Sequence, residues 1–211
     1  MKFESLIFDI DGTLWDAPAL VAEGYNIQLR KEGLSHLCVD EQTLRALFGR
    51  VMTEIADKIF PQIPVPERYE LMDRCMETEN RYLHENPCDI GYEGVKETLK
   101  KLAENYRLFI VSNAQKGYCE LCMEKLGLTE LFSGHLCFGD TGTEKGLTIQ
   151  KLMADHNITS AAYIGDTQGD LEATVVAQIP FIWAAYGFGN PDGYAGKTDD
   201  IRQLPQVLEA M

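Results

Sequence analysis

The sequence predicts an α/β protein built on a parallel β-sheet. Short apolar runs rich in β-branched and aromatic residues alternate with amphipathic helical patterns, which is typical of strands joined by helical connections. One long segment, from about residue 17 to residue 86, has helical patterns and no convincing strand, so it interrupts this alternation. A chain of 211 residues is long enough for one well-packed core and a smaller inserted domain.

The predicted elements follow from the spacing of apolar residues. We expect five strands, at SLIFDI (5–10), RLFIVSN (107–113), GHLCFGD (134–140), AAYIGD (161–166) and IPFIWAAY (179–186). Apolar residues at spacings of three and four predict helices between them, at 93–105, 115–127, 146–157 and 169–178. The same spacing predicts helices in the interrupting segment, at 19–33, 40–49 and 66–86. The expected division is a core of residues 1–16 and 87–211 with a helical domain of residues 17–86.

Composition and charge narrow the class of partner. The formal net charge of −14 argues against nucleic acid, because phosphate backbones select basic surfaces. The longest weakly polar run, residues 175–189, is interrupted by Gln178 and Pro180 and is shorter than the ~20 residues that cross a bilayer. The chain opens without a pattern typical of a signal peptide, so we expect a cytoplasmic protein with no membrane partner. A monomer and a homodimer are both compatible with this composition.

The six cysteines are expected to be reduced thiols, because a chain of this length without a leader rarely carries a disulfide framework. Cys119 and Cys122 have the CxxC spacing of redox and zinc sites, but no second pair of ligands accompanies them. The same spacing places both residues on one stripe of a helix. We therefore expect them to face the core as small apolar residues.

Polar side chains follow four of the five predicted strands. Ligands of open parallel sheets bind outside the carboxyl ends of the strands, so polar residues at several strand ends indicate a binding or catalytic edge. In chain order these residues are Asp9 and Asp11, Ser112 and Asn113, Lys145 in the loop after the third strand, and Asp166 with Asp170.

Two of these acids, Asp9 and Asp11, stand one residue apart at the mouth of a buried strand. Like charges repel at that distance, and an unpaired buried ion costs several kcal/mol, so a cation is expected to join them to Asp166. Carboxylates without neighbouring histidine or cysteine suit a hard ion that keeps its water ligands. We therefore expect Mg²⁺ rather than Zn²⁺.

Four short motifs, in order, carry a family resemblance: DIDGTLWD (9–16), VSN (111–113), the lone Lys145 and GDTQGD (165–170). Together they resemble the haloacid dehalogenase superfamily, in particular its phosphoglycolate-phosphatase-like branch. The resemblance implies a Rossmann-like three-layer core with a parallel sheet and an inserted small helical cap domain. It also implies a Mg²⁺-dependent phosphatase that hydrolyses a small-molecule phosphate monoester, a phosphorylated metabolite, through an aspartyl-phosphate intermediate.

The resemblance assigns a role to each acid. Asp9 resembles the nucleophile that attacks phosphorus, and Asp11 resembles the general acid and base. Family members also bind the metal through the main-chain carbonyl at the position of Asp11. Asp166 resembles the third metal ligand, and Asp170 resembles an acid that orients Asp166 or a metal-bound water.

The phosphate contacts are also carried over from the family. Ser112 and Lys145 resemble the groups that hold phosphate oxygens, and Lys145 also offsets the charge of Asp9 in the transition state. Asn113 belongs to the same candidate site. Thr13 lies where a hydroxyl and a main-chain N–H would meet phosphate. Arg50, after a glycine that breaks a helical pattern, is a candidate for contacting an anionic substrate or is an exposed helix-end arginine.

Departures from the family pattern leave alternatives open. KGLT (145–148) replaces the frequent Lys-Pro-x-Pro, and Trp15 either walls the substrate pocket or packs in the core. The acid at Asp11 argues against dehalogenase chemistry, whose enzymes generally lack it. A sugar-phosphate phosphomutase and a non-catalytic relative that binds a phosphorylated ligand are the two other functions considered. The substrate itself has no readable code in the sequence.

Overall fold

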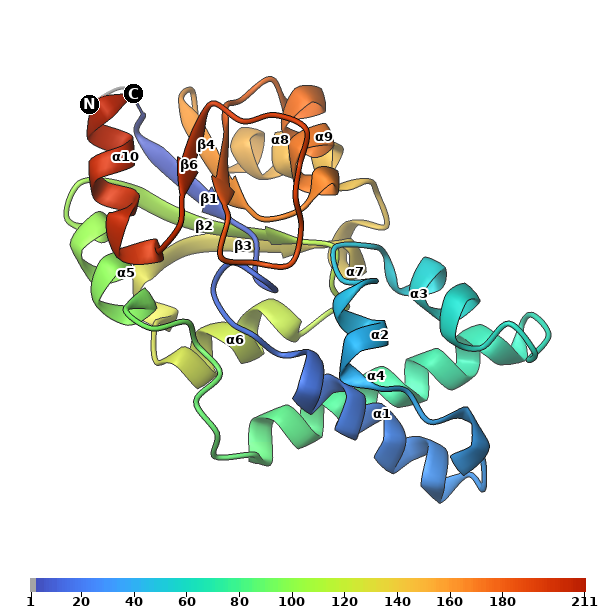
Figure 1. Ribbon diagram of the computed structural model, residues 1–211. Coiled ribbons are helices and arrows are strands. Elements are labelled where there is room, and N and C mark those ends of the chain that lie inside the picture. Colours follow the sequence, from blue (N-terminus) through green and yellow to red (C-terminus); the bar gives the residue numbers. More distant parts are fainter. Residues whose placement is uncertain (1–2) are drawn as a thin grey trace. The chain divides into compact units, whose positions relative to one another are not determined.

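The computed structural model describes residues 3–211 (Figure 1). By compactness the chain divides into two units, one of residues 1–16 with 90–211 and one of residues 17–89. Each unit is described by itself.

The first unit contains a six-stranded sheet in which every neighbouring pair is parallel. Its strand order is β3-β2-β1-β4-β5-β6, the order of the Rossmann fold. Ile7 of the central strand β1 pairs with Phe109 on one side and Tyr163 on the other. The strands are β1 (Ser5–Phe8), β2 (Arg107–Ser112), β3 (Phe132–Cys137), β4 (Ala161–Gly165), β5 (Phe181–Ala184) and β6 (Gly196–Thr198).

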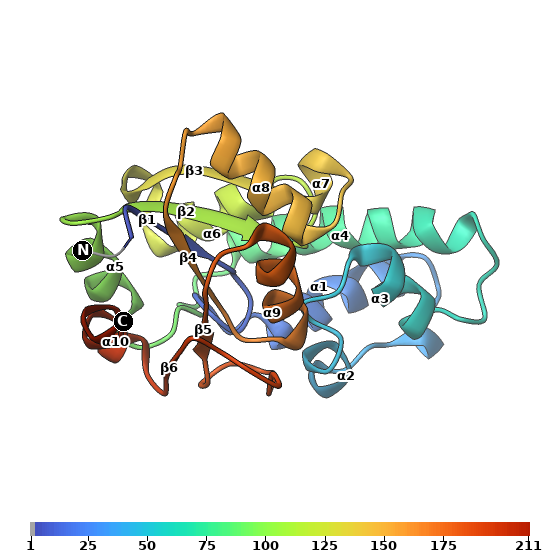
Figure 2. The ribbon, with the colours of Figure 1, turned by 90° about the horizontal axis from the view of Figure 1, so that it is seen from above.

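Helices cover both faces of this sheet, which makes three layers (Figures 1 and 2). On one face α8 (Lys145–Asp155) and α9 (Gln168–Ala177) pack over β2, β3, β4 and β5. On the other face lie α5 (Val95–Ala103), α6 (Tyr118–Leu126) and α10 (Leu204–Ala210). Because both faces are buried, the central strands are apolar at successive positions instead of alternating with polar residues.

The core beneath α8 and α9 joins strand residues to the inward side of both helices. Ile7, Phe109 and Tyr163 come from three adjacent strands, and Ile149 and Ala173 come from the two helices. These five side chains are at most 6% exposed, so the α8–α9 layer is anchored to the same strands whose ends carry the polar residues.

The second unit is entirely helical, with α1 (Pro18–Lys31), α2 (Glu41–Arg45), α3 (Met52–Ile59) and α4 (Glu67–Glu85). Its main packing joins α1 to α4. At Gly24 the two backbones approach so closely that a Cβ atom would lie 2.7 Å from the Cα of Glu79. A glycine is therefore required where these helices meet.

The fold agrees with the predicted parallel α/β architecture and inserted helical segment, but two local predictions were wrong and two short elements were missed. Residues 138–140, predicted as strand, form the start of the short helix α7 (Phe138–Thr141), because Asp140 accepts a hydrogen bond from the Cys137 main chain and caps the turn. Lys145 is the first residue of α8 and not a loop residue. The three-residue strand β6 and the helix α3 were not predicted, since neither has a long apolar repeat. Three short 3₁₀ turns, at Ser35–Leu37, Thr129–Leu131 and Ile201–Gln203, complete the described structure.

Two further expectations concern the cysteines and the membrane. All six cysteines are free thiols, and Cys119 and Cys122 are fully buried in α6, as their helical spacing predicted. Among residues 3–211 there is no helix with both the length and the apolar composition needed to span a membrane.

Candidate active site

The candidate site lies where the connections of the sheet diverge. From β1 the chain proceeds to β2 and β3 on one side, and β4 then returns to pair with the other side of β1. At such a point the loops after β1 and β4 lead away from each other and leave room for a ligand. Asp9 follows β1, Asp166 follows β4, and Asp170 lies in the first turn of α9.

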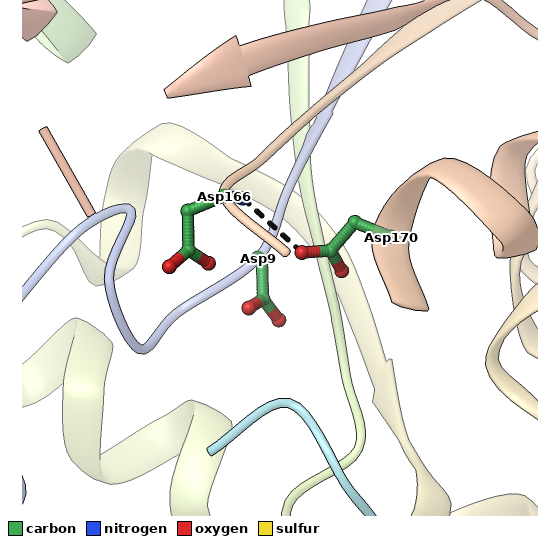
Figure 3. A group of neighbouring side chains, drawn as sticks. All are labelled: Asp9, Asp166 and Asp170. Carbon is green, nitrogen blue, oxygen red and sulfur yellow. Dashed lines mark hydrogen bonds between the residues drawn. The ribbon is translucent and has the colours of Figure 1, made fainter. Parts of the chain in front are cut away.

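These three acids form one buried group (Figure 3). One oxygen atom from each carboxylate can be chosen so that all three lie within 4.8 Å of one another. Asp9 is 2% exposed, and Asp166 and Asp170 are fully buried. The ammonium group of Lys145 is 2.9 Å from Oδ1 of Asp9 and 2.6 Å from Oδ1 of Asp170. One buried ammonium group therefore pairs with two of the three buried carboxylates, those of Asp9 and Asp170.

Asp170 is the best-compensated acid of the group. Its Oδ2 accepts hydrogen bonds from the main-chain N–H groups of Asp166 (3.1 Å) and Thr167 (2.9 Å), and from the Thr167 hydroxyl (2.8 Å). Burial alone would raise its pKa, but the charge of Lys145 and these hydrogen bonds outweigh burial and hold the pKa below its usual value. Asp170 is thus held as an anion, and it fixes both Lys145 and the main chain of Asp166.

Asp9 and Asp166 are less well compensated. Burial raises the pKa of Asp9 to about 6 despite the opposing charge of Lys145. Burial and the charges of Asp170 and Asp9 raise the pKa of Asp166 well above its usual value. Oδ2 of Asp166 accepts a hydrogen bond from the Phe188 main chain at 2.6 Å, whereas its Oδ1 is buried without a hydrogen-bond partner.

These observations fit a divalent cation. A buried carboxylate oxygen without a donor, beside two further carboxylates, is the environment that a positive ion stabilises. All the donor atoms of the group are carboxylate oxygens, which favours a hard ion over a thiophilic one. Asp9, Asp166 and Asp170 are therefore the residues suited to hold a metal ion.

The main chain comes close to this group at several glycines, and Gly12 and Gly187 approach the Asp166 side chain most closely. Gly12 has φ of +80°, and a Cβ there would lie 2.2 Å from Oδ2 of Asp166. At Gly187 a Cβ would lie 2.3 Å from the Gly12 carbonyl oxygen and 2.4 Å from the Cβ of Asp166. The loops after β1 and β5 can thus reach the acids only because both positions lack a side chain.

Asp11 lies outside this group of three acids and accepts two hydrogen bonds of its own. Its Oδ1 accepts from the indole Nε1 of Trp15 at 2.8 Å and from the hydroxyl of Tyr118 at 2.9 Å. Burial, and next the charge of Asp9, raise the pKa of Asp11 to about 7, against these two hydrogen bonds. The Asp11 side chain is not part of the acid group that suits a metal. A carboxyl group with this pKa exchanges a proton near neutral pH, as a general acid or base must.

The predicted phosphate contacts lie at the ends of β1 and β2. Thr13 is fully buried, its hydroxyl has no hydrogen-bond partner, and its carbonyl accepts from the Tyr186 hydroxyl at 2.9 Å. Ser112 is the last residue of β2, and its Oγ accepts from the Ala114 main chain at 3.4 Å. Asn113 follows it and is half-buried.

Arg50, the remaining candidate, belongs to the helical unit. Its exposed guanidinium is 3.4 Å from Oε2 of Glu54. Sequence reasoning therefore named every residue of the buried group, but it did not identify Tyr118 and gave Trp15 only as a pocket wall or packing residue. The order of β1 and β4 in the sheet brings Asp9 and Asp166 together, whereas Arg50 stands on a separate unit.

The fold and this site define a class of protein. Residues 6–184 match the haloacid dehalogenase-like hydrolases, so the chain belongs to that family and is an enzyme of the hydrolase class.

Particular relatives make the comparison more specific. The chain is 28% identical over 191 residues to a phosphoglycolate phosphatase of Agrobacterium fabrum. The aligned region covers 86% of this chain and 80% of the relative. It is 26% identical over 226 residues to a phosphoglycolate phosphatase of Xanthomonas campestris, covering 99% and 97% of the two chains. Among solved structures, one described as a predicted phosphatase from Clostridium acetobutylicum shares the fold with a TM-score of 0.84, 18% identity and 100% coverage of both chains.

Proposed function

We propose that this protein is a Mg²⁺-dependent phosphatase that hydrolyses a small-molecule phosphate monoester through an aspartyl-phosphate on Asp9. The main support is the buried group of Asp9, Asp166, Asp170 and Lys145 at the divergence of the sheet. Further support is the family match and the name phosphoglycolate phosphatase that several relatives carry.

In this proposal Asp9 is the nucleophile. One of its carboxylate oxygens attacks phosphorus, the bond from phosphorus to the ester oxygen breaks, and an acylphosphate forms. Lys145, ion-paired with Asp9 at 2.9 Å, keeps a positive charge beside the reacting group. As charge develops on the phosphoryl oxygens, this ammonium and the donors at Thr13, Ser112 and Asn113 stabilise it.

Asp11 is the general acid and base. In the first step its carboxyl proton passes to the leaving oxygen, which departs as an alcohol. In the second step Asp11 accepts a proton from the water that attacks phosphorus. The bond between phosphorus and the Asp9 oxygen then breaks, which returns Asp9 as a carboxylate and releases phosphate. A pKa near 7 supports both roles, because each protonation state is populated near neutral pH.

Asp9, Asp166 and Asp170, with the main-chain carbonyl of Asp11, are the groups that would hold Mg²⁺. When bound, the ion supplies positive charge that neutralises the acids and polarises the phosphoryl group. Asp170 also holds the Asp166 main chain by the hydrogen bond at 3.1 Å. The helical unit is the proposed cap domain, and Arg50 within it is a candidate contact for an anionic substrate.

The test separates the two neighbouring acids. Asp9→Asn should abolish turnover of every phosphate ester, because no carboxylate remains to form the acylphosphate. Asp11→Asn should lose alkyl phosphates such as phosphoglycolate but still release about one equivalent of nitrophenol from p-nitrophenyl phosphate, whose leaving group needs little protonation. The Asp11→Asn protein should then carry one added phosphate in its intact mass at low pH. A phosphorylated Asp9→Asn protein would contradict the assignment of the nucleophile.

A further inference from the structure

The carboxyl group of Asp11 is held by two aromatic donors that belong to different parts of the core. Trp15 is in the loop after β1, and Tyr118 is the first residue of α6, 107 positions from Asp11 along the chain. Both donate to the same oxygen atom, Oδ1, at 2.8 and 2.9 Å. Oδ2 receives neither of these hydrogen bonds.

Both donors are buried and packed against each other. Trp15 is fully buried and Tyr118 is 2% exposed. Their rings pack edge to face, with centroids 5.2 Å apart and an interplanar angle of 81°. The Trp15 main chain is also fixed, since its carbonyl accepts from Gly12 and its N–H donates to Ile10. Neither ring is free to follow Asp11 if its carboxyl group rotates.

This arrangement distinguishes the two oxygens of Asp11 chemically. The indole N–H is a donor only and cannot accept a proton, so the oxygen facing it serves as an acceptor. A protonated carboxyl group has one acceptor oxygen and one hydroxyl oxygen. With both donors directed at Oδ1, that oxygen is suited to be the acceptor and Oδ2 to be the hydroxyl oxygen.

We propose that Trp15 and Tyr118 are positioning residues that direct the proton of Asp11 onto Oδ2 and hold that oxygen toward the leaving group. This inference rests on the proposed function of Asp11 as general acid and base. The proton on Oδ2 moves to the ester oxygen as the phosphorus–oxygen bond breaks. A proton from the attacking water returns to Oδ2 when the acylphosphate is hydrolysed.

The main test compares two leaving groups in Tyr118→Phe, which removes one hydroxyl and keeps the ring. Single-turnover rates are measured with one alkyl phosphate and with the aryl phosphate p-nitrophenyl phosphate. The alkyl substrate is phosphoglycolate, or whichever alkyl phosphate of a panel the wild type cleaves fastest. We expect the alkyl rate to fall ~10-fold and the nitrophenol burst rate to change less than ~2-fold, because only the alkyl leaving group needs the positioned proton. Trp15→Phe should show the same selectivity, and the burst amplitude reports the fraction of folded enzyme.

Tyr163→Phe is the matched control. Tyr163 is fully buried in the same unit, but its hydroxyl donates to the Val111 carbonyl at 2.7 Å and not to Asp11. The ratio of alkyl to aryl rates should equal the wild-type ratio in this variant. Introducing Tyr118→Phe into Asp11→Asn should not lower the residual alkyl rate of that variant any further, because two residues that act through one group are not additive.

The outcomes separate the two proposals. If Asp11→Asn keeps the wild-type ratio of alkyl to aryl rates, then Asp11 is not the general acid, and the proposed function fails together with this inference. If Asp11→Asn loses alkyl substrates selectively while Tyr118→Phe and Trp15→Phe lose both substrates equally, or neither, only the positioning role is overturned.

Discussion

At the scale of single residues, the three neighbouring acids Asp9, Asp166 and Asp170 differ in how well their negative charges are compensated. Asp170 shares Lys145 with Asp9 but also accepts three hydrogen bonds at its second oxygen, which holds its pKa below the usual value. Burial raises the pKa of Asp9 to about 6, and burial together with the charges of Asp170 and Asp9 raises the pKa of Asp166 well above its usual value. Asp9 and Asp166 are therefore the acids whose charged forms are least stabilised by the protein, and Asp166 also has the oxygen without a hydrogen-bond partner.

Asp11→Asn should stabilise the metal-free protein, and the gain should grow with pH. Asparagine keeps a carbonyl oxygen for Trp15 and Tyr118 but carries no charge to bury. The pKa of Asp11 is raised to about 7 in the folded state, from about 4 when unfolded, so the wild type loses stability as pH rises through this window. Between about pH 5.5 and about pH 8 the advantage of the variant should increase by about 2 kcal/mol.

Urea unfolding with EDTA at the two pH values measures this difference. Neutral residues such as Thr43 and Thr148 do not titrate, so they do not contribute to the change in stability between the two pH values. The same comparison in Asp155→Asn, which alters an exposed acid on α8, serves as the control. An advantage that stays constant or shrinks with rising pH would show that Asp11 is not protonated in the folded protein near neutrality.

At the scale of elements, the loops at the carboxyl ends of the strands decide how the acids meet. The loop after β5 approaches the loop after β1 at Gly187, where a Cβ would lie 2.3 Å from the Gly12 carbonyl oxygen. Such a contact is too short for any real Cβ, so the backbone or Asp166 would have to move. The loop after β5 is thus part of the support for Asp166, together with the hydrogen bond from Phe188.

Gly187→Ala should weaken Mg²⁺ binding by about 10- to 100-fold, the range typical of changes in groups that orient metal ligands. Gly193→Ala is the control, because a Cβ there meets only Leu171 at 3.9 Å, an ordinary van der Waals distance. Isothermal titration of each variant with MgCl₂ gives the affinity. Equal affinities in the two variants would mean that the close approach at Gly187 does not hold Asp166.

At the scale of the whole molecule, the helical unit is inserted where two segments of the core already pair. The Asp16 N–H donates to the Ile90 carbonyl at 2.8 Å, and the Tyr92 N–H donates to Leu14 at 3.1 Å. The chain therefore leaves the core and re-enters it at neighbouring positions. An insertion whose ends lie together adds residues without separating the strands of the sheet.

Replacing residues 17–89 by a short Gly-Ser linker should leave a folded core that still binds Mg²⁺. The acid group, Lys145, Trp15 and Tyr118 all belong to the core unit, so their contacts do not require the helical unit. Circular dichroism, cooperative unfolding and titration with MgCl₂ test this expectation. A shortened chain that lacks a cooperative transition would show that the core depends on residues 17–89 for stability.

Mg²⁺ should stabilise the whole protein as well as activate it. A ligand bound only by the folded state at 100 times its dissociation constant raises the free energy of unfolding by about 2.7 kcal/mol. Asp166→Asn should lose most of this gain, whereas Asp155→Asn, which makes the same charge change on the surface, should keep it.

Thermal unfolding with EDTA and with MgCl₂ measures the gain, and phosphatase activity should disappear with EDTA and return with Mg²⁺. The stabilisation by Mg²⁺ should shrink as pH falls through about 6, because protons then compete with the metal for the Asp9 carboxylate. Full activity after complete chelation would refute the metal requirement.

The sequence by itself determined the α/β class, the helical insertion and the residues of the acid group. These are local properties: apolar spacing specifies strands and helices, and polar residues such as Asp9 and Asp166 stand at predicted strand ends. The carboxyl ends of parallel strands share one edge, so the gathering of these side chains could be anticipated without knowing the strand order. The end of β3 could not be anticipated, because the Asp140 side chain caps the following turn. The strand β6 could not be anticipated either, because its pairing to β5 defines it.

Only the tertiary structure decided which groups touch. Lys145 meets Asp9 across 136 positions of sequence, and Tyr118 meets Asp11 across 107. Such contacts depend on strand order, register and the packing of α6 and α8 on opposite faces of the sheet, none of which has a periodic signal in the chain. The sign of each pKa shift likewise depends on burial and on donors brought from distant segments, which is why neighbouring aspartates of identical chemistry differ in their protonation.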